Sequence, residues 1–171
     1  MPLGTSAGRT TSKTRSASKT QAKQQDAIKL LMADHDEVEA LFKQFQKLKN
    51  DGAQKADIVE QICKALTVHA EIEEEIFYPA AREALAEKDD DLLDEAEVEH
   101  ASIKSLVEQL QDADPSDGMY DAKVKVLCEY VNHHVKEEEG EIFPRIKKTD
   151  LDLEDLGAEL MERKQELMEE A

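Results

Sequence analysis

Two sets of residues of the types that bind metals recur along the chain at an offset of 65 residues. Four of the five histidines take part, together with two glutamates. The recurring positions are His35, His69 and Glu73, followed by His100, His134 and Glu138. Imidazole nitrogens and carboxylate oxygens together suit iron, manganese or zinc. The duplicated set therefore predicts a site for two metal ions that keeps open positions for water or a small ligand.

The residues around these positions repeat as well. The run HAEIEEEIFYP (69–79) matches HHVKEEEGEIFP (133–144), and the dipeptide at 34–35 matches that at 99–100. In each H-x-x-x-E pair the two side chains lie four residues apart, so both project from the same face of a helix. Glu74 and Glu139 are the expected outer partners of the metal ligands.

The fifth histidine, His133, does not share this register. It lies one residue before His134, which places it about 100° around a helix from the ligand face. We therefore expect His133 to be exposed on the surface and not to bind the metals.

Apolar residues spaced three or four apart predict four long helices, each with one buried face. These stripes run over 28–45, 58–80, 93–110 and 124–142 and contain all six candidate ligands. No strand-like alternation competes, so the pattern predicts an all-α fold, an up-down-up-down antiparallel four-helix bundle with short loops. Asn50-Asp51-Gly52 is a stop signal for the first helix. Pro79 and Pro144 are expected to bend or end two of the helices just beyond the site.

The heights of the histidines within such a bundle can be compared. His35 and His69 each lie 17 residues from the first loop, near residue 52, so they should face each other on adjacent helices. His100 and His134 lie 15 and 19 residues from the turn near residue 115, about one helical turn apart in height. A lone inward histidine is usually a core residue, but six such residues in one layer would cost several kcal/mol per carboxylate without a cation.

Composition places this site in a small, acidic protein. The 171 residues carry a formal net charge of −18, and the first 25 hold five basic residues and no acidic one. Such a charge disfavours nucleic acid or an anionic membrane as the main partner. The chain shows no membrane span and no secretory leader, so we expect a cytoplasmic protein. Cys63 and Cys128 are expected to be free thiols in such a compartment and not a disulfide.

The predicted organisation has three parts. Residues 1–25 are interpreted as a disordered basic tail, with an organelle-targeting leader or an electrostatic tether as alternatives. Residues 26–147 form the bundle. Residues 148–171 carry leucines at helical spacing and predict a short C-terminal helix that lies across the bundle.

The runs DHDEVEALF (34–42), HAEIEEEIFYP (69–79), EHASIKSL (99–106) and HHVKEEEGEIFP (133–144) resemble the hemerythrin-like, HHE cation-binding domain family. The resemblance covers residues 26–147. It implies a non-heme di-iron centre with an oxygen bridge between the metals, with iron favoured over manganese or zinc. The ligands that it implies are the six residues of the duplicated set.

Two departures separate this chain from the oxygen-carrying members of that family. Those proteins have a second histidine four residues after the one that matches His100, where this chain has Lys104. Their carboxylate on the fourth helix is an aspartate at a five-residue spacing, whereas Glu138 follows His134 by four. The departures disfavour reversible oxygen carriage, and the site is more similar to the branch that senses iron or repairs iron–sulfur centres.

Two functions follow from this resemblance as hypotheses. The first is a di-iron protein that binds, senses or reacts with a small oxidant such as oxygen, peroxide or nitric oxide, in stress or iron homeostasis, with a redox partner that the sequence does not name. The second is a non-enzymatic module that binds or donates iron. A bundle with an unrelated zinc site is a third, weaker alternative, and whether the chain turns over a substrate is left open.

Overall fold

The computed structural model describes residues 25–48 and 52–171, and within these ranges it contains helices but no strand. Short helical segments extend or connect the long helices: η1 (Glu73–Phe77), α3 (Tyr78–Ala84), η2 (Glu87–Asp89), η3 (Glu138–Ile142) and α6 (Phe143–Ile146). The long helices are α1 (Ala27–Lys47), α2 (Gly52–Ile72), α4 (Asp90–Gln111), α5 (Tyr120–Glu137) and α7 (Leu153–Glu170). The prediction of an all-α fold is confirmed.

Side-chain caps define where two of these helices begin. Asp26 accepts a hydrogen bond from the backbone N–H of Lys29 at 3.0 Å, and Asp152 caps α7 in the same way through the N–H groups of the first turn. At its other end α1 stops at Lys47, before an extended Leu48. Residues 1–24 of the predicted tail (1–25) and most of the predicted Asn50-Asp51-Gly52 stop lie outside the described residues.

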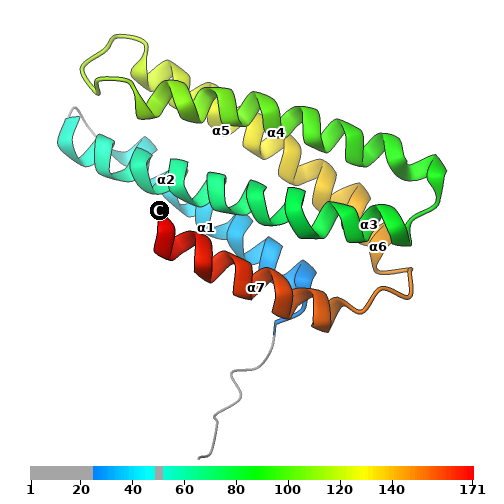
Figure 1. Cartoon of the computed structure of the whole chain (residues 1–171). Coiled ribbons are helices and arrows are strands. Elements are labelled where there is room, and N and C mark those ends of the chain that lie inside the picture. The colour runs from blue at the N-terminus through cyan, green and yellow to red at the C-terminus, as the bar shows by residue number, and fades with distance from the viewer. Residues whose placement is uncertain (1–24, 49–51) are drawn as a thin grey trace, which may run out of the picture.

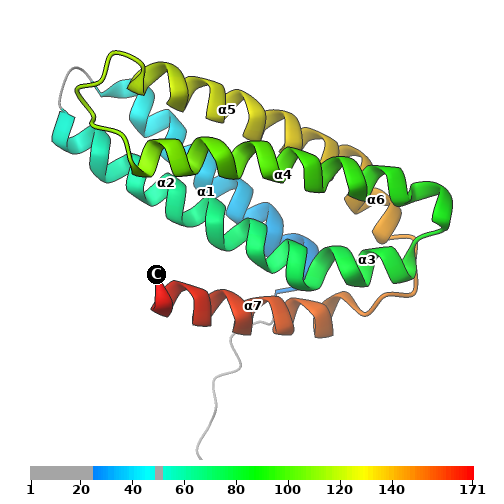
Figure 2. The same cartoon turned by 45° about the horizontal axis from the view of Figure 1, so that its top comes forward.

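The long helices lie side by side in pairs. α1 packs against α2, α4 packs against α5, and α2 contacts α4 across the pairs (Figure 1). α7 lies along α1 and α2, on the side away from α4 and α5 (Figure 2). The predicted C-terminal helix is thus present, but it is not short as predicted: with 18 residues it is as long as α5. None of the described helices is both long and apolar enough to cross a lipid bilayer.

The apolar core is divided into two clusters, one toward each end of the long helices. One cluster includes Leu31, Phe77 and Phe143, and the other includes Phe42, Leu66 and Leu127. The histidines of the duplicated set lie between the two clusters along each helix. Close-packed apolar side chains on both sides hold this layer in place and keep water out of it.

Pro79 and Pro144 do not end the helices that carry the candidate ligands. Instead, each proline follows a five-residue π-helical segment, and α-helix resumes beyond it. The N–H groups of Tyr78 and Phe143 bond to the carbonyls of Glu73 and Glu138, five residues back. Proline has no N–H to continue the α-helical ladder, so the wider turn absorbs the defect. Of the two predicted outcomes, a bend or an end of the helix, the end does not occur.

The π-helical segment also changes which residues point inward. The predicted stripe continued from Glu73 through Ile76 and Ala80, but these two are only half-buried, whereas Phe77 and Ala81 are buried. A π turn contains about one more residue than an α turn, which rotates the following residues relative to the core. The rotation also brings Tyr78 inward, next to the histidine layer.

Candidate metal centre

All six residues of the duplicated set are buried, and the structure brings them together between α1, α2, α4 and α5. Glu73 and Glu138 have no exposed surface. Two overlapping groups have nitrogen or oxygen atoms within 4.8 Å of one another. The first group is His35, His69, Glu73 and Glu138, and the second is Glu73, His100 and His134.

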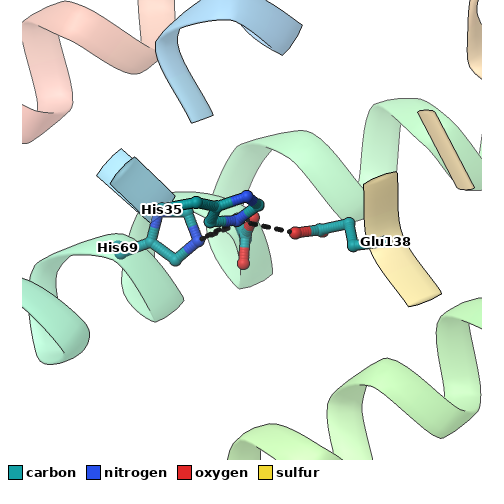
Figure 3. Close-up of side chains that lie close together, drawn as sticks. His35, His69 and Glu138 are labelled. Atoms are coloured by element: carbon teal, nitrogen blue, oxygen red, sulfur yellow. Dashed lines mark hydrogen bonds and ion pairs between the residues drawn. The ribbon is translucent and has the colours of Figure 1, made fainter. Parts of the chain in front are cut away.

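The histidines meet in pairs, one pair from each repeat. The Nε2 atoms of His35 and His69 lie 3.2 Å apart, and those of His100 and His134 lie 3.1 Å apart. The expectation that these residues face each other is confirmed. The ring of His35 lies between the ring of His69 and the carboxylate of Glu138, whose Oε2 is 3.1 Å from His35 Nε2 (Figure 3).

The two buried glutamates connect the histidine pairs. Glu73 Oε1 lies 3.1 Å from His69 Nε2, and Glu73 Oε2 lies 3.1 Å from His100 Nε2, so this carboxylate reaches both repeats. Despite these distances, Glu73 Oε1 and Glu138 Oε2 lack an aligned hydrogen-bond donor among the described residues. A fully buried carboxylate oxygen without a donor is costly unless a cation lies beside it. These two oxygens are therefore oriented as metal ligands would be, and the residues fit two metal ions.

Each of the four histidines uses its other ring nitrogen to contact a carboxylate. His35 Nδ1 lies 2.8 Å from Glu139, and His100 Nδ1 lies 2.9 Å from Glu74. These are the outer partners that the sequence predicted. A carboxylate at Nδ1 stabilises the tautomer with the proton on Nδ1, which leaves the Nε2 lone pair free for a metal.

The other two outer carboxylates were not predicted from the sequence. His69 Nδ1 lies 3.2 Å from Asp34, and His134 Nδ1 lies 2.8 Å from Glu99. The signal was present, because an acidic residue precedes both His35 and His100 in the repeat. Each of these acids lies beside the histidine of the neighbouring helix, not beside the histidine that follows it in sequence.

Tyr78 is a further residue that sequence reasoning missed, and it makes the two halves of the centre different. Its hydroxyl lies 3.1 Å from Glu138 Oε1, 3.4 Å from Glu73 Oε2 and 3.3 Å from His100 Nε2. The equivalent residue of the second repeat is Phe143, whose ring stacks on His35 with centroids 6.0 Å apart. Only the first repeat therefore places a hydroxyl donor against the shared carboxylates.

The electrostatics of the centre favour protonation of His35, His69 and His100 when no metal is bound. Burial alone would lower the pKa of His69, but the nearby carboxylates of Glu73 and Asp34 outweigh burial and raise this pKa to about 10. The pKa values of His35 and His100 are raised for the same reason. Burial would raise the pKa of Glu73, but His69 and His100 hold it well below its ordinary value. Metal binding must therefore displace protons.

A small apolar cavity lies against all four histidine rings. Its volume is about 20 Å³, and its other walls are mostly aliphatic: Val38, Leu66, Ala70, Ile103, Val131 and Val135, with Asp34 at one side. A cavity of this size holds about one water molecule. The space beside the candidate ligands therefore suits a single small molecule.

His133 is exposed, as the sequence predicted, with 60% of its side chain accessible. It contacts Glu99 and Glu137 on the surface, and its ring does not reach the buried layer. We expect His133→Ala to retain the wild-type metal content, whereas His134→Ala loses at least half of it, because only His134 directs a buried Nε2 at the glutamates. Metal analysis of the two purified variants tests this difference. Equal losses would mean that the wrong histidine was assigned.

Two known proteins are similar to this chain, one in sequence and one in fold. Over 124 residues, 72% of this chain, the sequence is 36% identical to a protein of Nostoc sp. named DNA nickase, and the match spans 33% of that protein. A crystal structure of a hemerythrin HHE cation-binding domain-containing protein from Mycobacterium kansasii superposes with a TM-score of 0.71 at 21% identity. That superposition covers 83% of this chain and 86% of the other.

The family model described as the hemerythrin HHE cation-binding domain matches residues 26–146. This segment contains the six candidate ligands and their four outer carboxylates, and it ends before α7. The chain belongs to the hemerythrin HHE cation-binding domain family.

Proposed function

We propose that this chain holds two iron ions with His35, His69, Glu73, His100, His134 and Glu138, and that it binds, senses or reacts with a small oxidant. In this proposal α1, α2, α4 and α5 form an up-down-up-down bundle, and each helix pair contributes two imidazoles to one ion. The glutamates would complete the ligand set, and Glu73, whose two oxygens reach histidines of both repeats, would contribute to holding both ions. Iron there would supply redox chemistry toward oxygen, peroxide or nitric oxide.

The observation that carries this proposal is the cavity of about 20 Å³ against the four imidazoles. A purely structural metal site is closed by its ligands, whereas a reactive site keeps an open position. Here an open space adjoins the candidate ligands, and it is apolar and small. These properties favour a diatomic molecule or peroxide over a larger substrate.

The surrounding side chains have definable roles in such chemistry. The outer carboxylates orient the imidazoles, and the aliphatic walls exclude bulk water. Burial and then the two glutamates raise the pKa of Tyr78 well above its ordinary value, so its phenol keeps its proton at neutral pH. Tyr78 can therefore donate a hydrogen bond at the edge of the centre, from one side only.

An anaerobic titration tests the proposal. Protein purified from iron-replete cells should contain about two irons per chain. Its near-ultraviolet charge-transfer bands should change when oxygen, peroxide or nitric oxide is added, because a new ligand alters the electronic structure of the iron. The Glu73→Ala variant is the matched control and should show a much smaller spectral change, because it should hold one iron or none. Iron-loaded protein whose spectrum responds to none of the three molecules would contradict the proposal.

The alternative is a module whose function is to hold or donate iron. Transfer of iron to an acceptor protein, without a response to any oxidant, would support it. The complete burial of Glu73 and Glu138 argues for slow release and so favours the first function. The Nostoc relative is named a DNA nickase, but the match covers only one third of that protein. The net charge of −18 disfavours nucleic acid as a partner of this chain.

A further inference from the structure

The inward face of α7 carries a lysine where the helical pattern calls for an apolar residue. Leu156, Leu160 and Leu167 are buried at spacings of four and seven residues. Lys164 lies between the last two, at the spacing that continues the stripe, and only 24% of its side chain is exposed. A charged residue on the buried stripe of a helix needs a partner. The partner of Lys164 lies in the layer of the metal centre.

A close backbone contact sets the position of α7 along α1. A Cβ atom at Gly157 would lie 2.4 Å from the carbonyl oxygen of Gln25 and 2.7 Å from the backbone nitrogen of Ala27. Only glycine allows this approach, since the atoms that a side chain would meet are backbone atoms. Lys164 follows Gly157 by seven residues, about two helical turns, and so faces α1 as well.

Lys164 is connected to a candidate ligand through one carboxylate. Its Nζ lies 2.5 Å from Asp34 Oδ1, while Asp34 Oδ2 lies 3.2 Å from His69 Nδ1. The side chain of Asp34 is 9% exposed, so both of its oxygens are held in a largely dry environment. The opposite nitrogen of His69, Nε2, is the one that points at Glu73. A chain of polar contacts thus runs from α7 to the metal centre.

Two of the other three outer carboxylates, Glu99 and Glu74, also have a basic side chain beside them. In the second repeat Glu99 contacts His134 Nδ1, and the outer contact of Glu99 is His133, from the repeat itself. The first repeat has the apolar Val68 at the position that matches His133. Lys104 provides a similar outer contact to Glu74, the partner of His100. At Asp34 the cation comes from α7, beyond residues 26–146.

We propose that Lys164 is a positioning residue of the metal centre, which acts through Asp34 to hold His69 in its ligating orientation, so that α7 controls metal retention in the first repeat. This inference rests on the metal centre proposed above. Without the ammonium group, the carboxylate of Asp34 would be buried beside a neutral imidazole with no cation and would move toward water. His69 would then lose the acceptor that fixes its tautomer and ring orientation.

The experiment measures iron release from the full chain. Wild-type, Lys164→Met and Lys164→Arg proteins are loaded anaerobically with Fe²⁺ and mixed with excess of a coloured Fe²⁺ chelator. We expect Lys164→Met to release one of the two irons about 10- to 100-fold faster, the usual effect of losing an outer partner. Lys164→Arg should restore much of the retention, because it keeps the charge next to Asp34.

Two controls separate positioning from the simple docking of α7. Arg163→Met removes the ion pair between α7 and Glu75 but leaves Asp34 untouched, so its release rate should stay within about twofold of wild type. In an Asp34→Asn background no buried charge needs a cation, so adding Lys164→Met should change release by no more than about twofold. Circular dichroism of each metal-free variant checks that the helices are intact.

The possible outcomes are distinguishable. Fast release in Lys164→Met but not in Arg163→Met, with no further acceleration when Lys164→Met is added to Asp34→Asn, supports the inference. If the loaded Lys164→Met protein retains iron like the wild type, or if Arg163→Met releases it equally fast, Lys164 is not a positioning residue, although the metal centre stands. A wild-type chain that binds no iron at all would overturn the metal centre and this inference together.

Discussion

Replacing Glu73 with alanine is expected to lower the metal content of the purified chain from about two ions to one or none. Glu73 belongs to both groups of converging ligand atoms, and its two oxygens lie 3.1 Å from histidines of different repeats. Glu138 belongs to the first group only. Glu138→Ala should therefore keep more metal than Glu73→Ala, with the remaining ion held by His100 and His134.

Metal analysis of the two variants, together with the optical spectrum of each, checks this order. Glu129→Ala is the matched control, since it removes an exposed glutamate of α5 and should leave the metal content unchanged. Glu73→Gln separates charge from shape, because the amide fills the same space but is a far weaker metal ligand than a carboxylate. Two full equivalents of metal in both the Glu73→Ala and the Glu138→Ala proteins would refute the ligand assignment.

The sequence allowed the buried layer to be predicted because the repeat offset and the helical period are both local properties of the chain. His35 and His69 are equidistant from one loop, and His100 and His134 are nearly so from another, which is sufficient to predict that they meet. The acidic outer partners on the ligand helices, Glu74 and Glu139, follow from the same periodicity. All of these inferences require only straight helices.

Other features depend on details that helical periodicity does not contain. The π-helical segments before Pro79 and Pro144 rotate the chain, which replaces Ile76 with Phe77 in the core and turns Tyr78 toward the glutamates. A pattern of α-helical spacing cannot anticipate that rotation. Pro79 and Pro144 correctly predicted where the helices are disturbed. The missing N–H of a proline does not by itself determine whether a helix ends or widens into a π-helical turn.

The contacts of Asp34 also could not be predicted from the sequence. Its partner on the inside comes from α2 and its partner on the outside comes from α7, and neither is a neighbour in the chain. The spacing of the leucines placed them on one face of α7 but did not say which helices that face packs against. The close backbone contact at Gly157 shows that it faces α1, and this contact can be recognised only in the folded structure.

Removing the metal is expected to lower the melting temperature of the chain by roughly 10 °C at neutral pH. A metal that binds only the folded state stabilises it by about 4 kcal/mol at a thousandfold excess over its dissociation constant. The metal-free protein should stay helical, since the two apolar clusters on either side of the layer are complete without metal. Thermal melts followed by circular dichroism, with and without a chelator, measure the difference.

The difference in melting temperature with and without chelator should depend on pH, because protons compete with the metal for the histidines. In the metal-free protein the pKa of His69 is raised from 6.5 to about 10, so its protonation stabilises the folded state fully below about pH 6.5 and is lost as the pH rises toward 10. The metal-bound protein needs the same imidazole neutral, so acid weakens metal binding. Both effects increase the difference in melting temperature between metal-loaded and chelated protein as the pH rises from about 5.5 to about 7.5.

The Glu73→Ala protein provides the control for these melts. Because it should bind one ion at most, its melting temperature should respond to the chelator much less than that of the wild type at both pH values. Wild-type protein that melts identically with and without chelator at neutral pH would show that the six buried residues hold no metal. If the difference in melting temperature between loaded and chelated protein narrows as the pH rises, protons do not compete with the metal for the imidazoles. His69 could not then be a ligand through Nε2.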